Sequence, residues 1–324
     1  MNRSLLALAA LLLGTATALA EVPRVVATIK PIHALVAGVM GDLGQPTLIV
    51  KGAVSPHTYS LRPSEAGAIE AADIVFWTGH GMEVFLEDSL STLAPNATSV
   101  ELSEAPGIEL LPVREGGMFE THAHEGEEGH EEGHEEGHDD HAHEGHDHGD
   151  AHEEMDMHVF LDPDNAKAMV AQIEAVLAAA DPDNAPTYAA NAAAQTAALT
   201  ALASDLETRL APVRSKPFVV FHDAYQYFAR RFDLNVAGSI TVNPESMPGA
   251  DRIAEVREKL KTLETACVFA EPQFDPRIVD VLIEGTSAGK GELDPEGANL
   301  AEGPALYPAL LTAMADSIAT CLGR

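Results

Sequence analysis

The sequence predicts an α/β protein of two lobes, each built around a parallel β-sheet, that are joined by one long helix. Short runs rich in β-branched residues alternate with helical stretches in both parts of the chain. Strands that alternate with helices in this way indicate parallel sheets. Between the two series lies an alanine-rich stretch. At 1.5 Å per residue, its roughly 25 residues form a helix ~38 Å long, enough to link two Rossmann-like lobes.

Residues 1–20 have the layout of a secretory signal peptide. Arg3 supplies a short positive region, residues 5–13 are apolar, and Ala18-Leu19-Ala20 matches a cleavage site. We therefore expect export to the periplasm with cleavage after Ala20. The mature protein should be soluble, because no later stretch approaches the ~18 apolar residues that a membrane span needs. A buried N-terminal helix is the alternative.

The predicted first lobe covers residues 21–183. Its strands are bounded by turn-forming residues and rich in valine and isoleucine, which favours buried strands. Polar and helix-forming residues fill the stretches between them. We expect strands over 22–29, 46–52, 72–79 and 157–163, and helices after Pro63, over 82–93 and from Asp162 to about Ala180.

Residues 115–156 interrupt this lobe with a different composition. They hold 17 acidic residues and 10 histidines, with no lysine, arginine, leucine, isoleucine or valine, and residues 129–138 repeat every four positions. Such a segment buries too little apolar surface to offset the entropy of ordering, so we expect a disordered loop. Its histidines form a candidate secondary metal-binding set: His122, His124, His130, His134, His138, His141, His143, His146, His148 and His152.

The linking helix is expected over residues 184–212. It begins near Pro186, which suits a first helical turn, and stops at Pro212. The second lobe, residues 213–324, repeats the alternation. We expect strands over 216–223, 234–240, 267–272 and 291–295, and helices over 224–232, 248–263, 276–284 and 304–319.

The charge of the chain excludes some partners. With 19 basic and 51 acidic residues the formal net charge is -32. Nucleic acids and anionic membranes carry the same sign, so neither is expected to bind. A protein that handles cations fits this charge.

Three histidines outside the acidic segment share a position in the predicted fold. His57 follows a strand, His158 begins one and His222 ends one. Ligands of open α/β sheets gather at strand ends, and three imidazoles with an open fourth position form an accepted zinc site. Asp294, at a strand end of the second lobe, is a candidate fourth ligand, or else a turn residue before Pro295. His33 and His80 are read as structural or turn residues.

Cys267 and Cys321 are the two cysteines of the chain. In an exported protein such a pair usually forms one disulfide, and we expect that here. Two buried thiols are the alternative.

Several segments together resemble the zinc-specific substrate-binding proteins of ABC uptake transporters, the ZnuA family. They are ATIKPIHALVAGV, SPHTYSLRPSEA, MHVFLDP, VFHDAYQYF, VFAEPQFDP and GELDPEGAN, which occur in the family's order along nearly the whole mature chain. The resemblance implies two lobes bridged by a rigid helix, with zinc in the cleft between them. It assigns the ligand role to His57, His158 and His222. Manganese-type relatives carry a glutamate in place of His222, so this histidine favours zinc.

The resemblance also implies the function and the partners. We expect a monomer that performs no reaction, binds Zn²⁺ and delivers it to an inner-membrane ABC permease with its ATPase. A periplasmic zinc chaperone is a further expected partner. Pro56 stands where some zinc-binding members have an acid, which leaves the fourth ligand open between Asp294 and water. Two other functions remain as alternatives: a zinc hydrolase with an open three-histidine site, and a periplasmic metal-buffering protein that uses the acidic segment.

Overall fold

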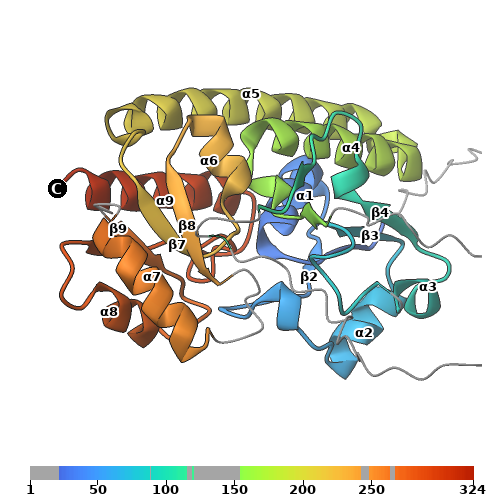
Figure 1. The fold of residues 1–324 in the computed structure, drawn as a ribbon. Coiled ribbons are helices and arrows are strands. Elements are labelled where there is room, and N and C mark those ends of the chain that lie inside the picture. Colours follow the sequence, from blue (N-terminus) through green and yellow to red (C-terminus); the bar gives the residue numbers. More distant parts are fainter. Residues whose placement is uncertain (1–21, 88, 115–118, 120–153, 242–247, 263–266) are drawn as a thin grey trace, which may run out of the picture.

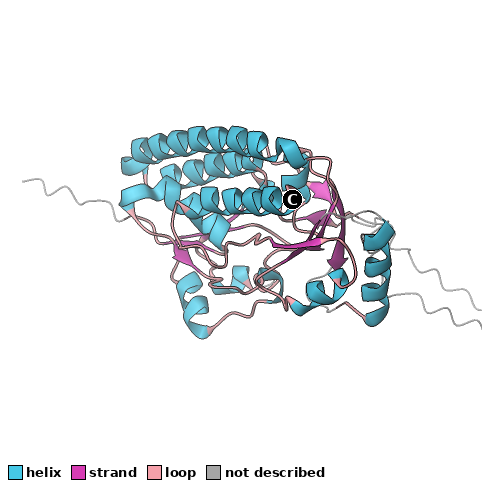
Figure 2. Ribbon diagram, turned by 90° about the vertical axis from the view of Figure 1, so that its left-hand side faces the viewer, coloured by secondary structure: helices cyan, strands magenta, loops and turns pink. Residues whose placement is uncertain are grey.

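The computed structural model describes residues 22–87, 89–114, 119, 154–241, 248–262 and 267–324. These residues form two four-stranded parallel sheets with helices above and below them, as Figures 1 and 2 show. The predicted fold class is confirmed. We call the elements from β1 to α4 the first lobe and those from β7 to α9 the second lobe.

The first sheet has the strand order β2-β1-β3-β4, and all its pairs are parallel. The residues of β1 and β3 are all buried, as expected for strands covered on both faces. Edge strand β4 was not predicted, because three of its four residues are polar. The strands are β1 (Val25–Ala27), β2 (Thr47–Leu48), β3 (Ile74–Trp77) and β4 (Thr98–Glu101).

The second sheet has the order β10-β9-β7-β8 and is also parallel. Strands β7 and β9 lie at its centre and are completely buried. All four strands were predicted, with bounds that differ by a few residues. They are β7 (Phe218–His222), β8 (Val236–Thr241), β9 (Cys267–Ala270) and β10 (Gly289–Glu292).

The helices begin where the local sequence favours a start. Asp162 caps α4 by accepting a hydrogen bond from the Asp164 backbone N–H at 2.8 Å, and prolines occupy the first turns of α1, α2, α4 and α5. The helices are α1 (Lys30–Met40), α2 (Pro63–Glu70), α3 (Leu90–Leu93), α4 (Pro163–Ala180), α5 (Ala185–Leu210), α6 (Gln226–Phe232), α7 (Ala250–Thr262), α8 (Arg277–Ile283) and α9 (Leu306–Leu322).

The long helix α5 runs along the top of the molecule in Figure 1 and packs against α4, α1 and α9. Its 26 residues contain many alanines, the strongest helix former. Because α4 belongs to the first lobe and α9 to the second, α5 links both. One continuous apolar core also runs through both lobes, from β1 to α9. A smaller core lies between the second sheet and α7 and α8.

Two further contacts join parts of the structure. The first connects the two lobes, and the second connects the second sheet to α9. Lys30, buried at the start of α1, donates hydrogen bonds to the carbonyls of Gly297 at 2.9 Å and Ala298 at 2.7 Å. A disulfide joins Cys267 at the start of β9 to Cys321 near the end of α9, which confirms the predicted pairing. In the parts of the chain that the structure describes, none of the helices has the length and apolar character needed to cross a bilayer.

A short antiparallel ribbon corrects two predictions. Strands β5 (Leu111–Pro112) and β6 (Met155–Asp156) pair on either side of the acidic segment, so residues 155–156 do not belong to a disordered loop. The strand expected over 157–163 is wrong, because Val159–Leu161 form a 3-10 helix. These three apolar residues are all buried, and a short buried run does not distinguish a strand from a helical turn.

The helix expected over 82–93 is also wrong for most of its length. Of the residues that the structure describes in this range, only Leu90–Leu93 are helical, and turns cover most of residues 80–87. The cause is Glu83, which is buried and accepts hydrogen bonds from the backbone N–H groups of Thr78 at 3.0 Å and Gly79 at 3.1 Å. This side chain holds the backbone in a turn.

Candidate metal centre

The three candidate histidines come from three separate segments that meet between the lobes. His57 lies in a 3-10 helix (Pro56–Thr58) between β2 and α2. His158 precedes the 3-10 helix over Val159–Leu161, and His222 is the last residue of β7. The carboxyl end of β7 thus faces the crevice, as expected for a binding site in a parallel α/β sheet.

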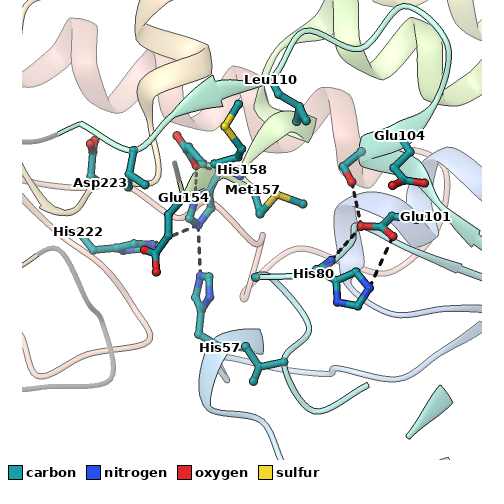
Figure 3. A pocket seen from close by; sticks show the side chains of 16 residues that line it. His57, His80, Glu101, Glu104, Leu110, Glu154, Met157, His158, His222 and Asp223 are labelled. Atoms are coloured by element: carbon teal, nitrogen blue, oxygen red, sulfur yellow. Dashed lines mark hydrogen bonds and ion pairs between the residues drawn. The ribbon is translucent and has the colours of Figure 1, made fainter. Parts of the chain in front are cut away.

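The Nε2 atoms of these histidines converge on one point, as Figure 3 shows. The Nε2 of His158 lies 3.4 Å from that of His57 and 3.3 Å from that of His222. Two nitrogens bonded to one zinc ion at ~2.0–2.1 Å with a tetrahedral angle are ~3.3–3.4 Å apart. The two observed separations therefore fit two edges of a zinc tetrahedron, and the ligand atoms of His57 and His222 lie within 4.8 Å of each other. At the same bond length, the 90° angles of an octahedral site would need ~2.8–3.0 Å.

Two buried carboxylates fix the tautomers of His158 and His222. The Nδ1 of His158 donates to Asp156 Oδ1 at 2.8 Å, and the Nδ1 of His222 donates to Glu271 Oε2 at 2.7 Å. With the proton on Nδ1, each neutral ring presents the lone pair of Nε2 to the centre. Such carboxylate–histidine pairs orient metal ligands and raise their basicity.

Backbone geometry explains why Glu271 meets His222. Glu271 directly follows β9, which pairs in parallel with β7, and the two strands end at the same edge of the sheet. The backbone N–H of His222 also donates to Glu271 Oε1 at 3.3 Å. Asp156 likewise accepts from the backbone N–H of His158 at 3.0 Å.

His57 is held differently from the other two. Its side chain is half-buried, its backbone N–H donates to Ser55 Oγ at 3.3 Å, and its ring interacts with the backbone of Gly81. Two residues later, the hydroxyl of Tyr59 donates to Glu65 Oε1 at 2.8 Å, which ties the loop to α2. All these contacts lie within the first lobe.

The electrostatics favour neutral rings at two of the three histidines. Burial and the neighbouring histidines hold the pKa values of His57 and His158 well below their usual range. Burial also lowers the pKa of His222, but the bonded Glu271 carboxylate, together with Asp223 and Asp156, outweighs burial and raises that pKa. Burial raises the pKa of Asp156 to about 7. A cation at the three nitrogens would oppose this shift and favour the ionised carboxylate.

Asp294 is not part of the converging group. Among the residues that the structure describes, the group whose ligand atoms lie within 4.8 Å of one another contains only the three histidines. Asp294 Oδ1 accepts hydrogen bonds from Gln273 Nε2 at 3.0 Å and from the backbone N–H groups of Glu296 and Gly297 at 3.2 and 3.0 Å. These bonds match its alternative role as a turn residue.

The remaining histidines have other positions. His33 is buried, with Nε2 3.1 Å from the carbonyl oxygen of Pro46. His80 packs edge-on against Trp77 at 5.1 Å between ring centroids and lies at the cavity that reaches the centre. The candidate secondary set, from His122 to His152, lies outside the described residues.

A cavity of about 710 Å³ opens onto the histidines from one side. Its described lining contains carboxylates and no lysine or arginine, so it concentrates cations near the centre. The acidic residues that line it are Glu101, Glu104, Glu154, Asp156 and Asp223.

Sequence analysis missed Asp156 and Glu271 as functional residues. Asp156 was assigned to the acidic segment by composition, although its position two residues before His158 was a usable signal. Glu271 was placed at the end of a predicted strand. The convergence of parallel strand ends could have paired it with His222.

Comparisons with known proteins find relatives that are named for zinc uptake. The sequence profile described as "Zinc-uptake complex component A periplasmic" matches residues 25–321. A high-affinity zinc uptake system protein ZnuA from Brucella suis is 47% identical over 306 residues, covering 93% of this chain and 92% of the relative. The protein of the same name from Paracoccus denitrificans is 39% identical over 314 residues, covering 96% of each chain.

Solved structures share the fold. A crystal structure of ZnuA superimposes with a TM-score of 0.71 at 25% identity, covering 92% of this chain and 99% of the other. The periplasmic zinc-binding protein TroA from Treponema pallidum has a TM-score of 0.74 at 19% identity, covering 93% and 99%. The second likeness concerns the fold alone.

Proposed function

The chain belongs to the family of periplasmic zinc-uptake components A, and on that premise we propose that it captures Zn²⁺ with His57, His158 and His222. Membership makes it the periplasmic zinc-binding component of a zinc uptake system, with zinc as ligand and an ABC permease as partner. The hydrolase alternative is not supported, since the family is one of transport proteins.

One observation carries the ligand assignment. The Nε2 separations of 3.3 and 3.4 Å fit the edges of a zinc tetrahedron, and two of the rings have Nδ1 bound to a carboxylate. This set of three nitrogen donors differs from the sites of hard cations, which prefer oxygen ligands. Zinc is therefore the divalent ion that this donor set suits.

We propose water as the fourth ligand. The three hydrogen bonds to Asp294 Oδ1 support this, because ligation by that oxygen would compete with them. The cavity beside the histidines leaves room for a water molecule. Ligation by Asp294, the alternative from the sequence, would require the turn at Glu296 and Gly297 to rearrange.

Delivery completes the proposed function. The protein acts as a monomer that docks on the permease of a transporter driven by an ATPase, and it releases zinc when docking moves ligand-bearing segments apart. A periplasmic zinc chaperone is a proposed donor. Cleavage after Ala20, lobe boundaries near residues 183 and 213, and metal binding by His122–His152 also remain proposals from the sequence.

The test is a zinc titration under a competing chelator, with the full chain and a variant that lacks residues 120–152. We expect one tight zinc site in both proteins, because the three ligands lie outside the deleted segment. Loss of the tight site on deletion would instead favour the metal-buffering alternative, in which the acidic segment does the binding.

A further inference from the structure

The backbone on both sides of His158 is attached to the second lobe by two tyrosines. Tyr227 of α6 donates its hydroxyl proton to the carbonyl of Asp156 at 2.7 Å. Tyr307 of α9 donates to the carbonyl of Phe160 at 2.5 Å. These carbonyls lie two residues before and two residues after His158, so the histidine sits between two fixed points.

Tyr227 also holds the other strand of the ribbon. Its hydroxyl accepts a hydrogen bond from the Leu111 backbone N–H at 2.8 Å while it donates to Asp156. One oxygen therefore binds both β5 and β6. Nearby, Arg114 Nε donates to Asp223 Oδ2 at 2.9 Å, which adds an ion pair between the ribbon and the residue after His222.

Tyr227 belongs to the same lobe as His222. Tyr227 follows His222 by five residues, and both α6 and β7 belong to the second lobe. Through Asp156, which binds the Nδ1 of His158, the hydroxyl of Tyr227 connects the orientation of one ligand to the strand that carries the other. His57 has no comparable contact in what the structure describes, because its hydrogen bonds run to Ser55 and Gly81.

We propose that Tyr227 and Tyr307 are positioning residues that fix His158 against His222, so that these two histidines form one preorganised half of the zinc site and His57 completes it. The proposal rests on the proposed function of the three histidines. It groups the ligands differently from chain order, in which His57 and His158 both fall in the predicted first lobe and His222 in the second.

The chemistry of the tyrosines suits this role. Both side chains are at most 2% exposed, and burial raises their pKa values, so the hydroxyls stay protonated and donate throughout the neutral range. A buried hydroxyl that satisfies backbone groups is rigid, since losing it leaves those groups without partners. Ligands that are held before zinc arrives need little further ordering when it binds.

The experiment combines Tyr227→Phe with single ligand removals. Zinc affinity is measured by chelator competition for Tyr227→Phe in the wild-type, His57→Ala and His222→Ala backgrounds. Tyr188→Phe is the matched control, because its hydroxyl is also buried and hydrogen-bonded, to Asp181 Oδ2 at 2.9 Å in the α4–α5 connection. Tyr307→Phe repeats the test from the other side of His158, and thermal melts verify folding.

We expect Tyr227→Phe to lower zinc affinity by about tenfold in the wild-type and His57→Ala backgrounds. This is the lower end of the loss expected when residues that support metal ligands by hydrogen bonds are mutated. In the His222→Ala background the change should be within about twofold, because no ligand then remains on the second-lobe strand against which the hydroxyl aligns His158. Tyr188→Phe should leave affinity unchanged in all backgrounds.

An equal loss in the His222→Ala background would overturn the proposal, since it would mark a general structural role. No loss for either tyrosine in the other two backgrounds would overturn it as well. A wild-type protein that binds no zinc, or that binds equally well without the histidines, would instead refute the proposed function. The two failures are therefore distinguishable.

Discussion

The surroundings of His57 and of the His158–His222 pair differ in three respects. Both members of the pair are buried and bind a buried carboxylate through Nδ1, whereas His57 is half-buried and interacts with backbone groups. The segment of His158 is bonded to the second lobe, while the loop of His57 is bonded to the first. The site therefore consists of a rigid pair and a third ligand carried by a separate loop.

This difference suggests how tight binding and release are combined in one site. Three ligands held by one rigid body would bind zinc tightly but would release it slowly. When one ligand sits on its own loop, a movement of that loop is enough to reduce the site to two ligands. The permease would then need to displace only the segment around Pro56–Thr58.

The largest expected effect is the loss of a ligand from the pair. His158→Ala or His222→Ala should lower zinc affinity by more than ~100-fold, which is the upper end of the loss expected when a residue hydrogen-bonded to a metal ligand is replaced. His57→Ala should cost less, because the preorganised pair remains. Chelator competition on the three variants gives the order, and a larger loss for His57→Ala than for His222→Ala would contradict the comparison.

Next in size is the carboxylate behind His222. Glu271→Gln keeps an oxygen that can accept a hydrogen bond from His222 Nδ1–H, but it removes the negative charge. We expect zinc affinity to fall by ~10–100-fold. Glu258→Gln on the exposed face of α7 is the control for the same change elsewhere. Equal affinities of the two variants would show that Glu271 does not support the ligand.

A smaller effect concerns protons released on binding. Zinc needs neutral imidazoles. The lowered pKa values of His57 and His158 mean that both are already neutral near pH 7, whereas the raised pKa of His222 makes it the ligand that keeps its second ring proton to the highest pH. Zinc should displace that proton, and affinity should fall as the pH decreases. Calorimetry in two buffers of different ionisation enthalpy measures the release.

In Glu271→Gln the release near pH 7 should decrease, because the main cause of the raised His222 pKa is gone. An unchanged proton release in this variant would show that His222 is not the protonated ligand.

The smallest effect on the tight site is expected from the acidic segment. Removing residues 120–152 should change the affinity of the three-histidine site by less than about twofold, and should abolish additional weaker zinc binding. The four-residue repeat of this segment offers many similar donor groups. Binding zinc with them requires the chain to be ordered around the ion, which costs conformational entropy. Calorimetric titration separates the two classes. Segment sites as tight as the three-histidine site would refute this expectation.

The sequence predicted both sheets apart from strand β4, together with the long helix, the disulfide and the three converging histidines. Valine-rich strands, alanine-rich helices and a histidine at a strand end, as at His222, can be read from neighbouring residues alone. The turn at Glu83 and the ribbon β5–β6 could not be predicted in this way. Both depend on partners far along the chain, such as Thr28 for Glu83 at 2.5 Å and Tyr227 for the ribbon.

The same limit explains the assignment of His158. Chain order placed it with His57 in the first lobe, whereas the carbonyls of Asp156 and Phe160 on either side of it are bonded to tyrosines of α6 and α9, 71 and 147 residues away. Asp294 shows the reverse case, since its position in a turn was a valid signal for the hydrogen bonds it makes. Ligand type was predictable from the residues, but the grouping of the ligands depended on tertiary contacts.

The most direct test of the three-histidine centre is a crystal structure of the full chain with zinc, in which anomalous scattering locates the metal. We predict one strong zinc peak between the lobes, bonded to the Nε2 atoms of His57, His158 and His222 at ~2.0–2.1 Å, with water in the fourth position. A strong zinc peak away from these nitrogens, or one bonded to Asp294 in place of a histidine, would contradict the account.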